Sequence, residues 1–581
     1  MSSFFVADDK IPITQQSVAI PSENGLSYNS TQTIEIQVPP STKFINPKDS
    51  YLQMNVKIKP DANAVGKTRL QLDTEMGGQI LIKDIRIYDG NRNTLLEEIT
   101  DYNTMVAMKY DFHQNKSLRN KRALTEGSNV EQVRARGTRG SSVSQSCNVQ
   151  TNPYFKPKRT FPDDTVFADD DFLSAKLNLP LHTGLFQNDR ILPIMLLDGL
   201  HISITLEDNY RVFRQMDNVL LGRRTTLNPI FHSTNGTSAS SIGNTSATTT
   251  FYVNVANDMI SAENLPFVVG EQINLYNTTT TTNASWNGSV FPKISKIEFD
   301  TSTTPDMIKI TTQSVTNATG ATITTDGAWV FYSESVRQAA SYDATYTVSN
   351  VELVLSEVMM PQAYESSMLA RMREGGSLSY DFLSVTNYRY SQLASDRVAN
   401  IRIPIDNSRC KSILCVPTDA DVYTQKQLLE GDEAGKQTYK IFHNNTRDYR
   451  FHSGRSGMVG LADHISDYVF MYNGKLQPSR RVSCSKTGNK VSIAQQHLIE
   501  LDKGLSAAGI DVHSMRKYNE NFVIGRALAL GSGVYDARNK DFNLQVNYQE
   551  TNAPSKPKLW KNYVFHLRRL VIKGDTIVVE L

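Results

Sequence analysis

The chain has 581 residues, 39% of them hydrophobic and 21% charged, and its formal net charge at pH 7 is only +2. This length suggests about three or four units, or two large β domains with an insertion, each able to bury a sizeable core. The composition excludes an intrinsically disordered chain. The balanced charge excludes a strong net electrostatic attraction of the whole chain to nucleic acid or membranes.

The N-terminal residues predict no secretion signal. The apolar run within residues 1–10 is too short for a signal peptide. Residues 191–206 come nearest to a membrane span, but Asp198 and His201 interrupt them before ~18 apolar residues accumulate. We therefore expect a protein that is made and used in a reducing compartment and is not secreted through a signal peptide.

Alternation of apolar and polar residues with period two is the dominant pattern and predicts half-buried strands. It is clearest at residues 34–38, 52–58, 200–206 and 542–548, and it returns at 577–581. One apolar and one polar face is what antiparallel sheets in a sandwich require.

Helices are few, and their ends are recognisable. One is predicted at about residues 101–112. A second covers 361–374, with Pro361 in its first turn and two glycines after it. A third opens at the capping-box pattern Ser492-x-x-Gln495 and carries a stripe of apolar residues through Leu505.

Two charged segments lie between the first helix and the strand at residue 200. Residues 114–140 carry seven basic and two acidic residues. The segment is either a flexible basic loop that contacts the phosphate of a genome or membrane, or a solvated loop that touches a neighbouring subunit. We favour the solvated loop. Residues 163–171 contain five aspartates that resemble a cation site but lack the glycine and distal glutamate of a calcium loop, so we expect a solvated loop.

An insertion interrupts the first half of the chain. Residues 225–336 contain no arginine and three lysines against eight acidic residues, and Thr, Ser and Asn dominate. Strand patterns remain at residues 251–255 and 329–332. We interpret the segment as a small β-rich subdomain on a surface loop.

The two halves of the chain repeat the same order of features. Residues 84–90 match 467–474, since each is a strand that ends in Tyr and an Asp-Gly or Asn-Gly turn typical of hairpins. Further on, residues 199–208 match 541–550, and each half closes with a long strand, at 346–355 and 563–581. The shared order favours a duplicated β fold over chance similarity.

Recognisable catalytic motifs are missing from the sequence. Gly66-Lys67-Thr68 resembles the end of a phosphate-binding loop, but Asp61 replaces the glycine required five residues earlier. His201 and His566 lie within strand patterns and are expected to be satisfied sandwich or polar-face residues. We therefore predict no catalytic, cofactor-binding or metal site and no cofactor.

The four cysteines form no C-x-x-C pair and are expected to be buried free thiols. On a regular strand Cys410 and Cys415 would face opposite sides, because five residues separate them. The others are Cys147 and Cys484.

Four segments together resemble the double jelly-roll major capsid proteins of polinton-like viruses and virophages, relatives of the adenovirus hexon lineage. They are Phe44-Ile-Asn-Pro-Lys-Asp-Ser-Tyr-Leu, residues 179–206, Tyr346-Thr-Val-Ser-Asn-Val-Glu-Leu-Val-Leu, and residues 468–481. Each is weak alone, and their order makes the match moderately specific over about residues 30–581. The insertion at 225–336 matches no segment of the family and corresponds in position to its variable outward tower.

This resemblance implies an all-β fold of two tandem eight-stranded antiparallel jelly rolls with short helices and a β-rich tower in the first. The expected division is an N-terminal arm (1–25) that orders only against neighbours, jelly roll 1 (26–360, with the insertion at about 209–344), a linker helix (361–376) and jelly roll 2 (377–581).

The resemblance also implies a major capsid protein rather than an enzyme. It would form homotrimers through an interface above ~2,000 Å² per pair, and the trimers would tile an icosahedral shell. Its expected partners are itself, neighbouring trimers, and penton and minor capsid proteins, with possible weak contact of residues 114–140 with the genome or an inner membrane. No small-molecule substrate is expected, and the expected location is the virion, assembled inside the host cell.

Two other classes remain open. One is a trimeric viral fibre or a glycan-binding jelly-roll protein that uses the 225–336 insertion. The other is a β-sandwich glycoside hydrolase, which needs two carboxylates about 5–10 Å apart in a cleft. No stalk repeat favours the fibre, and no aromatic-rich carboxylate motif favours the hydrolase.

Overall fold

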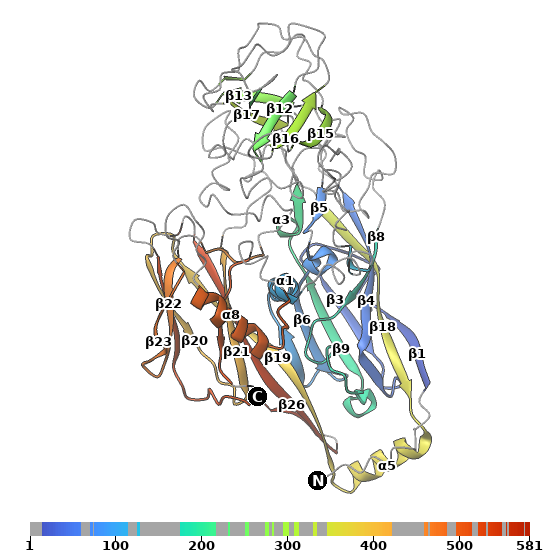
Figure 1. Cartoon of the computed structure of the whole chain (residues 1–581). Coiled ribbons are helices and arrows are strands. Elements are labelled where there is room, and N and C mark those ends of the chain that lie inside the picture. The colour runs from blue at the N-terminus through green and yellow to red at the C-terminus, as the bar shows by residue number, and fades with distance from the viewer. Residues whose placement is uncertain are drawn as a thin grey trace.

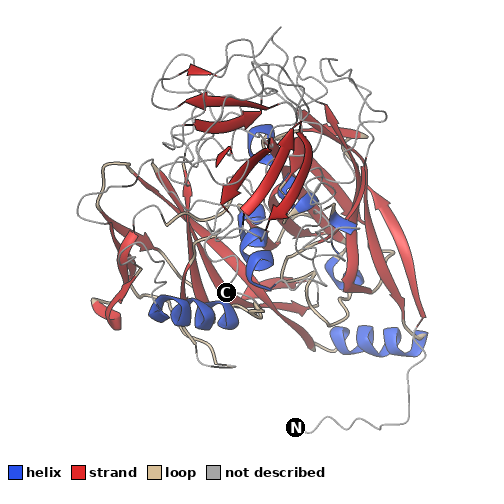
Figure 2. Ribbon diagram, turned by 45° about the horizontal axis from the view of Figure 1, so that its top comes forward, coloured by secondary structure: helices blue, strands red, loops and turns tan. Residues whose placement is uncertain are grey.

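Strands make up about half of the residues that the computed structural model describes, and two β-sandwiches contain most of these strands (Figures 1 and 2). The structure describes residues 14–59, 70–73, 75–113, 122, 125–127, 175–215, 231–232, 250–254, 273–277, 282–283, 294–300, 307–312, 329–333, 345–420, 458–462, 465–484, 495–513, 521–529, 531, 533–548, 554, 557–574 and 576–580.

The first sandwich packs two antiparallel sheets face to face. One sheet has the order β1 (Thr14–Pro21), β18 (Thr345–Met359), β4 (Ile45–Lys59) and β8 (Ala175–Pro180), with β2 (Ser27–Asn29) also paired to β18. The other has the order β3 (Thr33–Val38), β9 (Leu200–Leu206), β6 (Ile82–Asp89) and β7 (Leu95–Ile99).

The alternating residues account for these strands. In β3 every second residue is buried, and the same holds along β4 from Leu52 to Ile58. The apolar residues of facing sheets therefore meet in one core, while Gln53 and Asn55 lie outside it. The predicted alternation at 34–38, 52–58, 200–206 and 542–548 is confirmed.

The second sandwich is built in the same way. One sheet has the order β19 (Ser377–Gln392), β26 (Lys558–Lys573), β21 (Cys410–Asp419) and β24 (Ile524–Ala527), and β27 (Thr576–Glu580) also pairs with β26. The facing sheet has the order β20 (Val398–Ile403), β25 (Phe542–Tyr548), β22 (Ile465–Tyr472) and β23 (Lys475–Ser483).

Both sandwiches share one strand connectivity. In each, the first strand pairs with the last, the last with the third and the third with the sixth, while the second, seventh, fourth and fifth form the facing sheet. This is the eight-stranded jelly-roll arrangement. The segments matched in sequence occupy equivalent places, namely β6 with β22, β9 with β25 and β18 with β26. The predicted fold class, two tandem jelly rolls, is confirmed.

The three predicted helices are confirmed as α1 (Tyr102–His113), α5 (Gln362–Arg373) and α8 (Gln495–Ala507). The capping serine, Ser492, lies outside the described residues. Helices α1 and α8 are equivalent, since each follows the fifth strand of its roll and precedes the sixth. Short elements complete the rolls: η1 (Gly77–Leu81), η3 (Ile194–Leu197), α3 (Asn209–Val212), and the paired strands β5 (Leu70–Leu72) and β10 (Phe213–Gln215).

The insertion lies between the last two strands of the first roll and contains two antiparallel sheets. One has the order β11 (Phe231–His232), β12 (Thr250–Asn254), β16 (Met307–Thr312) and β15 (Ile294–Asp300); the other has β14 (Thr282–Asn283), β13 (Ile273–Asn277) and β17 (Trp329–Ser333). Figure 1 places these strands at one end of the molecule and α5 at the other. The predicted β-rich tower is confirmed.

Both predicted hairpins form, but through different turns. Asn473 and Gly474 have positive φ angles and join Tyr472 directly to Lys475. The loop after Asp89 is longer, because β7 begins only at Leu95. There Gly90 is required for a close approach, since a Cβ would lie 1.8 Å from the carbonyl oxygen of Asp198.

Two expectations from the sequence are wrong. Residues 14–21, assigned to an arm that orders only against neighbours, form β1 and pair along their whole length with β18. Cys410 and Cys415 lie on one face of β21, because a bulge after Cys410 shifts the register, so that their partners on β26 are His566 and Asn562. Both thiols are free and buried, as predicted.

The division of the chain at residues 25, 360 and 376 stays a prediction. No helix in the described part of the chain is long and apolar enough to cross a membrane.

Candidate functional site: the seam between the two rolls

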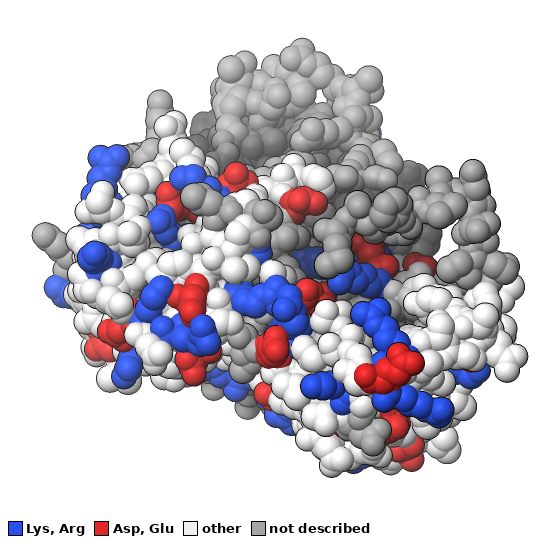
Figure 3. Space-filling model, turned by 90° about the horizontal axis from the view of Figure 1, so that it is seen from below, with Lys and Arg blue, Asp and Glu red and all other residues white. Residues whose placement is uncertain are grey.

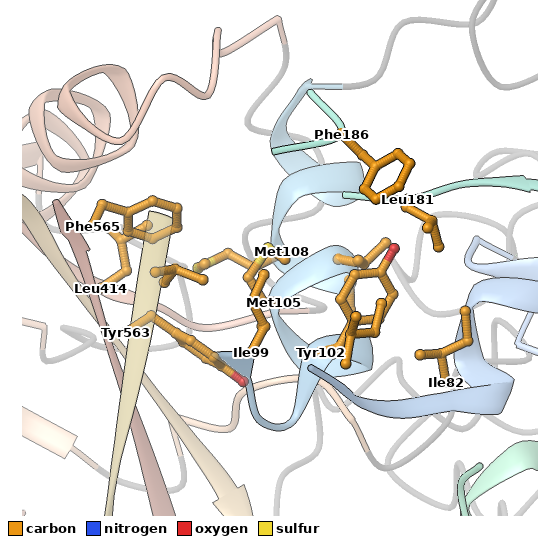
Figure 4. Close-up of a cluster of buried hydrophobic side chains, with 14 of the residues drawn as sticks. Ile82, Ile99, Tyr102, Met105, Met108, Leu181, Phe186, Leu414, Tyr563 and Phe565 are labelled. Atoms are coloured by element: carbon orange, nitrogen blue, oxygen red, sulfur yellow. The ribbon is translucent and has the colours of Figure 1, made fainter. Parts of the chain in front are cut away.

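Helix α1 lies between the two sandwiches and contacts both. Figure 4 shows Tyr102 pointing toward Ile82 and Leu181 of the first roll, and Met105 and Met108 lying between the helix and the second roll. Residues 102–108 of α1 are all buried, because the helix packs against both rolls, and its buried polar residues include Asn103 and Thr104. We call this contact, formed by α1 and the 181–190 loop against β19 and β26, the seam.

A buried ion cluster centres on Asp101, immediately before α1. Its carboxylate lies 3.2 Å from Nζ of Lys561 and accepts a hydrogen bond of 2.6 Å from Nε of Arg389 and one of 2.8 Å from Nδ2 of Asn387. Its carbonyl oxygen accepts from the hydroxyl of Tyr563 at 2.9 Å. One residue of the first roll is thereby bound to four residues of the second.

Burial disfavours the charged form of Asp101, but its ion pairs favour that form more strongly. Burial alone raises the pKa of Asp101, whereas the positive charges of Lys561 and Arg389 lower it, and the net direction is downward. The Lys561 side chain is only 1% exposed and also donates to Oγ1 of Thr104 at 2.7 Å. Burial lowers the pKa of Lys561, and the charge of Asp101 only partly opposes this shift. The contacts of Asp101 and Thr104 with Lys561 hold α1 against β26.

A second buried carboxylate joins the loop after β8 to the second roll. Glu97 accepts hydrogen bonds from the backbone N–H groups of Gly184 and Leu185, at 2.8 and 3.0 Å, and from the hydroxyl of Ser384 on β19 at 2.9 Å. Burial raises the pKa of Glu97, and these N–H donors and the nearby Arg568 only partly oppose it.

The 181–190 loop contacts β19 without room for larger side chains. A Cβ on Gly184 would lie 2.1 Å from the carbonyl oxygen of Leu383. Nearby, Nδ2 of Asn188 donates to the carbonyl oxygen of Asp381 at 2.8 Å, and the hydroxyl of Tyr380 donates to the carbonyl oxygen of Arg190 at 2.8 Å. The spacing of the two rolls is thus set by backbone contact.

Hydrogen bonds also close the far end of α1. Nδ2 of Asn521 donates to the carboxylate of Asp111 at 2.7 Å, and the backbone N–H of His513 donates to the carbonyl oxygen of Phe112 at 3.0 Å. The seam is therefore held at both ends of α1 and along the adjoining loop, so that the two rolls form a rigid pair.

A polar network fills the first roll behind α1. The hydroxyl of Tyr110 donates to Glu126 at 2.7 Å and lies 2.6 Å from Nε2 of His182, whose Nδ1 is 3.2 Å from Nζ of Lys109. Burial lowers the pKa of Lys109 to about 8, and burial with the charges of Lys109 and Arg122 holds that of His182 well below its usual range.

Arg122 is the one basic residue of the 114–140 segment that the structure describes. Its guanidinium lies 3.5 Å from the ring centroid of Tyr110, and its Nη1 donates to the carbonyl oxygen of Glu75 at 3.1 Å. This arginine thus packs inside its own chain. The other basic residues of the segment, the aspartates at 163–171, Gly66-Lys67-Thr68 and Cys147 lie outside the described residues.

The two histidines singled out in the sequence are structural. His201 is buried on the polar side of its sheet, with Nδ1 2.9 Å from Oε1 of Gln37 and Nε2 against the carboxylate of Glu35. His566 is buried beside Thr386, whose Oγ1 lies 2.9 Å from its Nε2. In the part of the chain that the structure describes, no three His, Cys, Asp or Glu side chains gather as metal ligands.

Sequence reasoning did not single out the residues of the seam. Asp101 follows a strand and precedes a helix, as many exposed capping residues do. Lys561 offered the better signal, because it follows Trp560 and precedes the run Tyr563-Val564-Phe565 in a strand rich in aromatic residues. A lysine there predicts a buried partner of opposite charge, although the sequence does not say which carboxylate supplies it.

Comparison with known proteins gives matches among solved structures only. No protein-family model and no curated protein matches the chain. The chain is similar to the Faustovirus major capsid protein at 9% identity and a TM-score of 0.49, over 98% of this chain and 92% of that one. It is also similar to the PBCV-1 virus capsid (10%, 0.48, 100% of both chains) and the mavirus major capsid protein (9%, 0.39, 97% and 90%).

Proposed function

We propose that this chain is the major structural subunit of an icosahedral viral capsid and that three copies associate into a capsomer with a near-hexagonal outline. The observation that carries the proposal is the repetition of one jelly-roll connectivity in two sandwiches that lie side by side. The sequence resemblance to double jelly-roll capsid proteins points the same way.

The proposed mechanism is geometric. Each copy supplies two blocks of similar shape, so three copies around a threefold axis supply six, and a six-sided outline tiles a shell with one gene product. Such tiling requires that the two blocks of a copy do not rotate against each other. The buried contacts of Asp101, Glu97 and Gly184 across the seam supply that rigidity.

The two ends of the molecule suggest its orientation in the shell. The insertion strands lie at one end of the first roll, and α5 crosses at the opposite end (Figure 1). We place the insertion on the outer surface, where a variable loop is tolerated, and α5 on the inner side. Strands then stand roughly normal to the shell.

Protein contacts are the proposed role of the inner side. Figure 3, which views the molecule from below, shows Lys and Arg interspersed with Asp and Glu on the described part of that face. Two of the ion pairs within the chain are Lys43 with Glu365 at 2.6 Å and Arg409 with Asp381 at 3.0 Å. A face of mixed sign suits neighbouring capsomers and minor capsid proteins better than a uniform array of phosphates.

Light scattering and electron microscopy of the purified protein test this proposal. We expect a particle with three times the mass of one 65.1 kDa chain, and top views with a six-sided outline. A stable, self-sufficient monomer at micromolar concentration contradicts the proposal, and so does a trimer whose top view shows three lobes rather than six.

A further inference from the structure

Helices α1 and α8 occupy equivalent places in their rolls, and one residue of each aligns the two helices. Tyr102 of α1 points into the first roll toward Ile82 (Figure 4). His497 of α8 is buried in the second roll, where its Nδ1 lies 3.0 Å from the hydroxyl of Tyr468 and its ring stacks on Phe522. With Tyr102 matched to His497, the two helices can be compared residue by residue.

The side of α1 that contacts the second roll is exposed in α8. Thr104 accepts a hydrogen bond from Lys561 at 2.7 Å, and Met108 lies between α1 and the second roll (Figure 4). The matching residues of α8 are Ile499, which is 54% exposed, and Lys503, whose side chain is 58% exposed. They are four residues apart and therefore lie on one side of the helix, which we call the α8 face.

The strands that receive α1 at the seam also have equivalents in the first roll. Strands β19 and β26 are the first and last of the second roll and pair with each other, as β1 and β18 do in the first. Figure 1 places β1 and β18 on the side of the first roll away from the second. Ser17 and Ala19 of β1 are exposed, whereas Ile20 packs on the core, so the outer face of this strand pair is open.

The closing strands align through the aromatic residues near their starts. Trp560 of β26 and Tyr346 of β18 both belong to the hydrophobic core. With these two matched, Lys561, which binds Thr104 at the seam, corresponds to Thr347 on the outer face of β18. The place that Thr104 has at the seam is thus the place of Ile499 opposite Thr347.

One turn further along the helix, the same alignment brings opposite charges together. The pairing of β18 with β4 contains a bulge before Glu352, which puts Glu352 on the outer face beside Gln53 and at the position of Phe565 in β26. Met108 and Phe565 belong to one apolar cluster at the seam (Figure 4). Lys503 stands in the place of Met108, so an apolar contact within the chain corresponds to a lysine and a glutamate on the two open faces.

We propose that the α8 face docks on the outer face of β1 and β18 of a second copy of this chain, with Ile499 against Thr347 and Lys503 beside Glu352. The contact repeats the seam between copies. Each copy offers one such face and receives another, so three copies close a ring. This inference rests on the proposed function, because it names the surfaces through which the copies meet.

Light scattering of the full chain over a dilution series tests the docking. Ile499→Asp puts a charge into the proposed contact, and we expect the concentration at which half of the chains are trimeric to rise by about tenfold or more. Val398→Asp, at a residue of β20 that is 49% exposed, is the matched control and should leave this concentration unchanged. An unchanged value for Ile499→Asp with a trimeric wild type overturns this inference alone, whereas a monomeric wild type overturns the proposed function with it.

Charge reversal tests the register and does not depend on Ile499→Asp. Lys503→Glu and Glu352→Lys should each raise the half-trimer concentration by about fivefold or more, and both in one chain should restore it, because every contact then holds the reversed pair. Arg402→Glu on β20, where the side chain is 77% exposed, should have no effect. Weakening by each variant without restoration in the double variant contradicts the pairing of Lys503 with Glu352.

A disulfide between copies tests the contact directly. Ile499→Cys and Thr347→Cys in one chain should give, after oxidation, a product of three times the chain mass in a denaturing, non-reducing gel. The two single variants control for the native thiols and should run at the mass of one chain. A trimeric protein in which the double variant also runs at the mass of one chain overturns the proposed placement.

Discussion

Replacing Asp101 by Asn should loosen the seam, because the change keeps the side chain's shape and removes its charge. Lys561 then remains buried with only neutral partners, namely the Asn side chain and Thr104, whose Oγ1 lies at 2.7 Å. At 3.2 Å and an effective dielectric constant of about 20, the lost attraction is about 5 kcal/mol. Removal of one partner from a buried pair costs about 3–5 kcal/mol. We therefore expect a loss of about 4 kcal/mol in the free energy of unfolding.

Urea titration followed by tryptophan fluorescence measures this loss, since Trp560 is buried next to Lys561 on β26. The double variant Asp101→Asn with Lys561→Met removes both charges and should recover at least half of the loss. The exposed pair of Arg402 and Asp541, at 3.4 Å, is the control, and Asp541→Asn should cost no more than about 0.5 kcal/mol. A loss below about 1 kcal/mol for Asp101→Asn, or strictly additive effects in the double variant, refutes the reasoning.

Acid should weaken the fold, because burial lowers the pKa of His497 and His566 to about 3, below the value of about 6.5 that they have when unfolded. As the pH falls, the unfolded state binds the proton first, so each histidine lowers the free energy of unfolding by about 2 kcal/mol between pH 7.5 and 5.0. Urea titrations of the wild type and of His566→Gln at both pH values measure this loss. The prediction is contradicted if the two proteins lose the same stability over this pH range. Below about pH 4 the contribution of Asp101 is lost as well, because its pKa is lowered in the folded state. Gly184→Ala should push β19 away, since the new Cβ meets a backbone oxygen. We expect urea titration to show a loss of about 1–3 kcal/mol in the free energy of unfolding. An unfolding midpoint equal to that of the wild type would show that this backbone contact does not set the spacing of the two rolls. Phe470→Ala opens a cavity in the second roll, where Phe470 is fully buried, and should cost about 3–5 kcal/mol, against under 1 kcal/mol for the exposed Leu476→Ala.

The sequence by itself determined the strands, the duplication and the tower. Alternation with period two places one face of each strand in a core whatever its partner, so Ile34, Leu544 and their neighbours were predicted correctly. Turn chemistry at Asn473-Gly474 is equally local, and the matched order of segments predicted two rolls before any pairing was known.

Only the tertiary structure decided how the two rolls are joined. Lys561 pairs with Asp101, and Glu97 accepts a hydrogen bond from Ser384. Each partner lies in the other roll, hundreds of positions away, and no local pattern encodes such distances. The place of residues 14–21 was misjudged for the same reason: their side chains are mostly exposed, and their backbone pairs with β18, more than three hundred residues later. Backbone hydrogen bonding leaves little trace in the side-chain pattern, so an exposed edge strand reads in sequence as an unpaired arm.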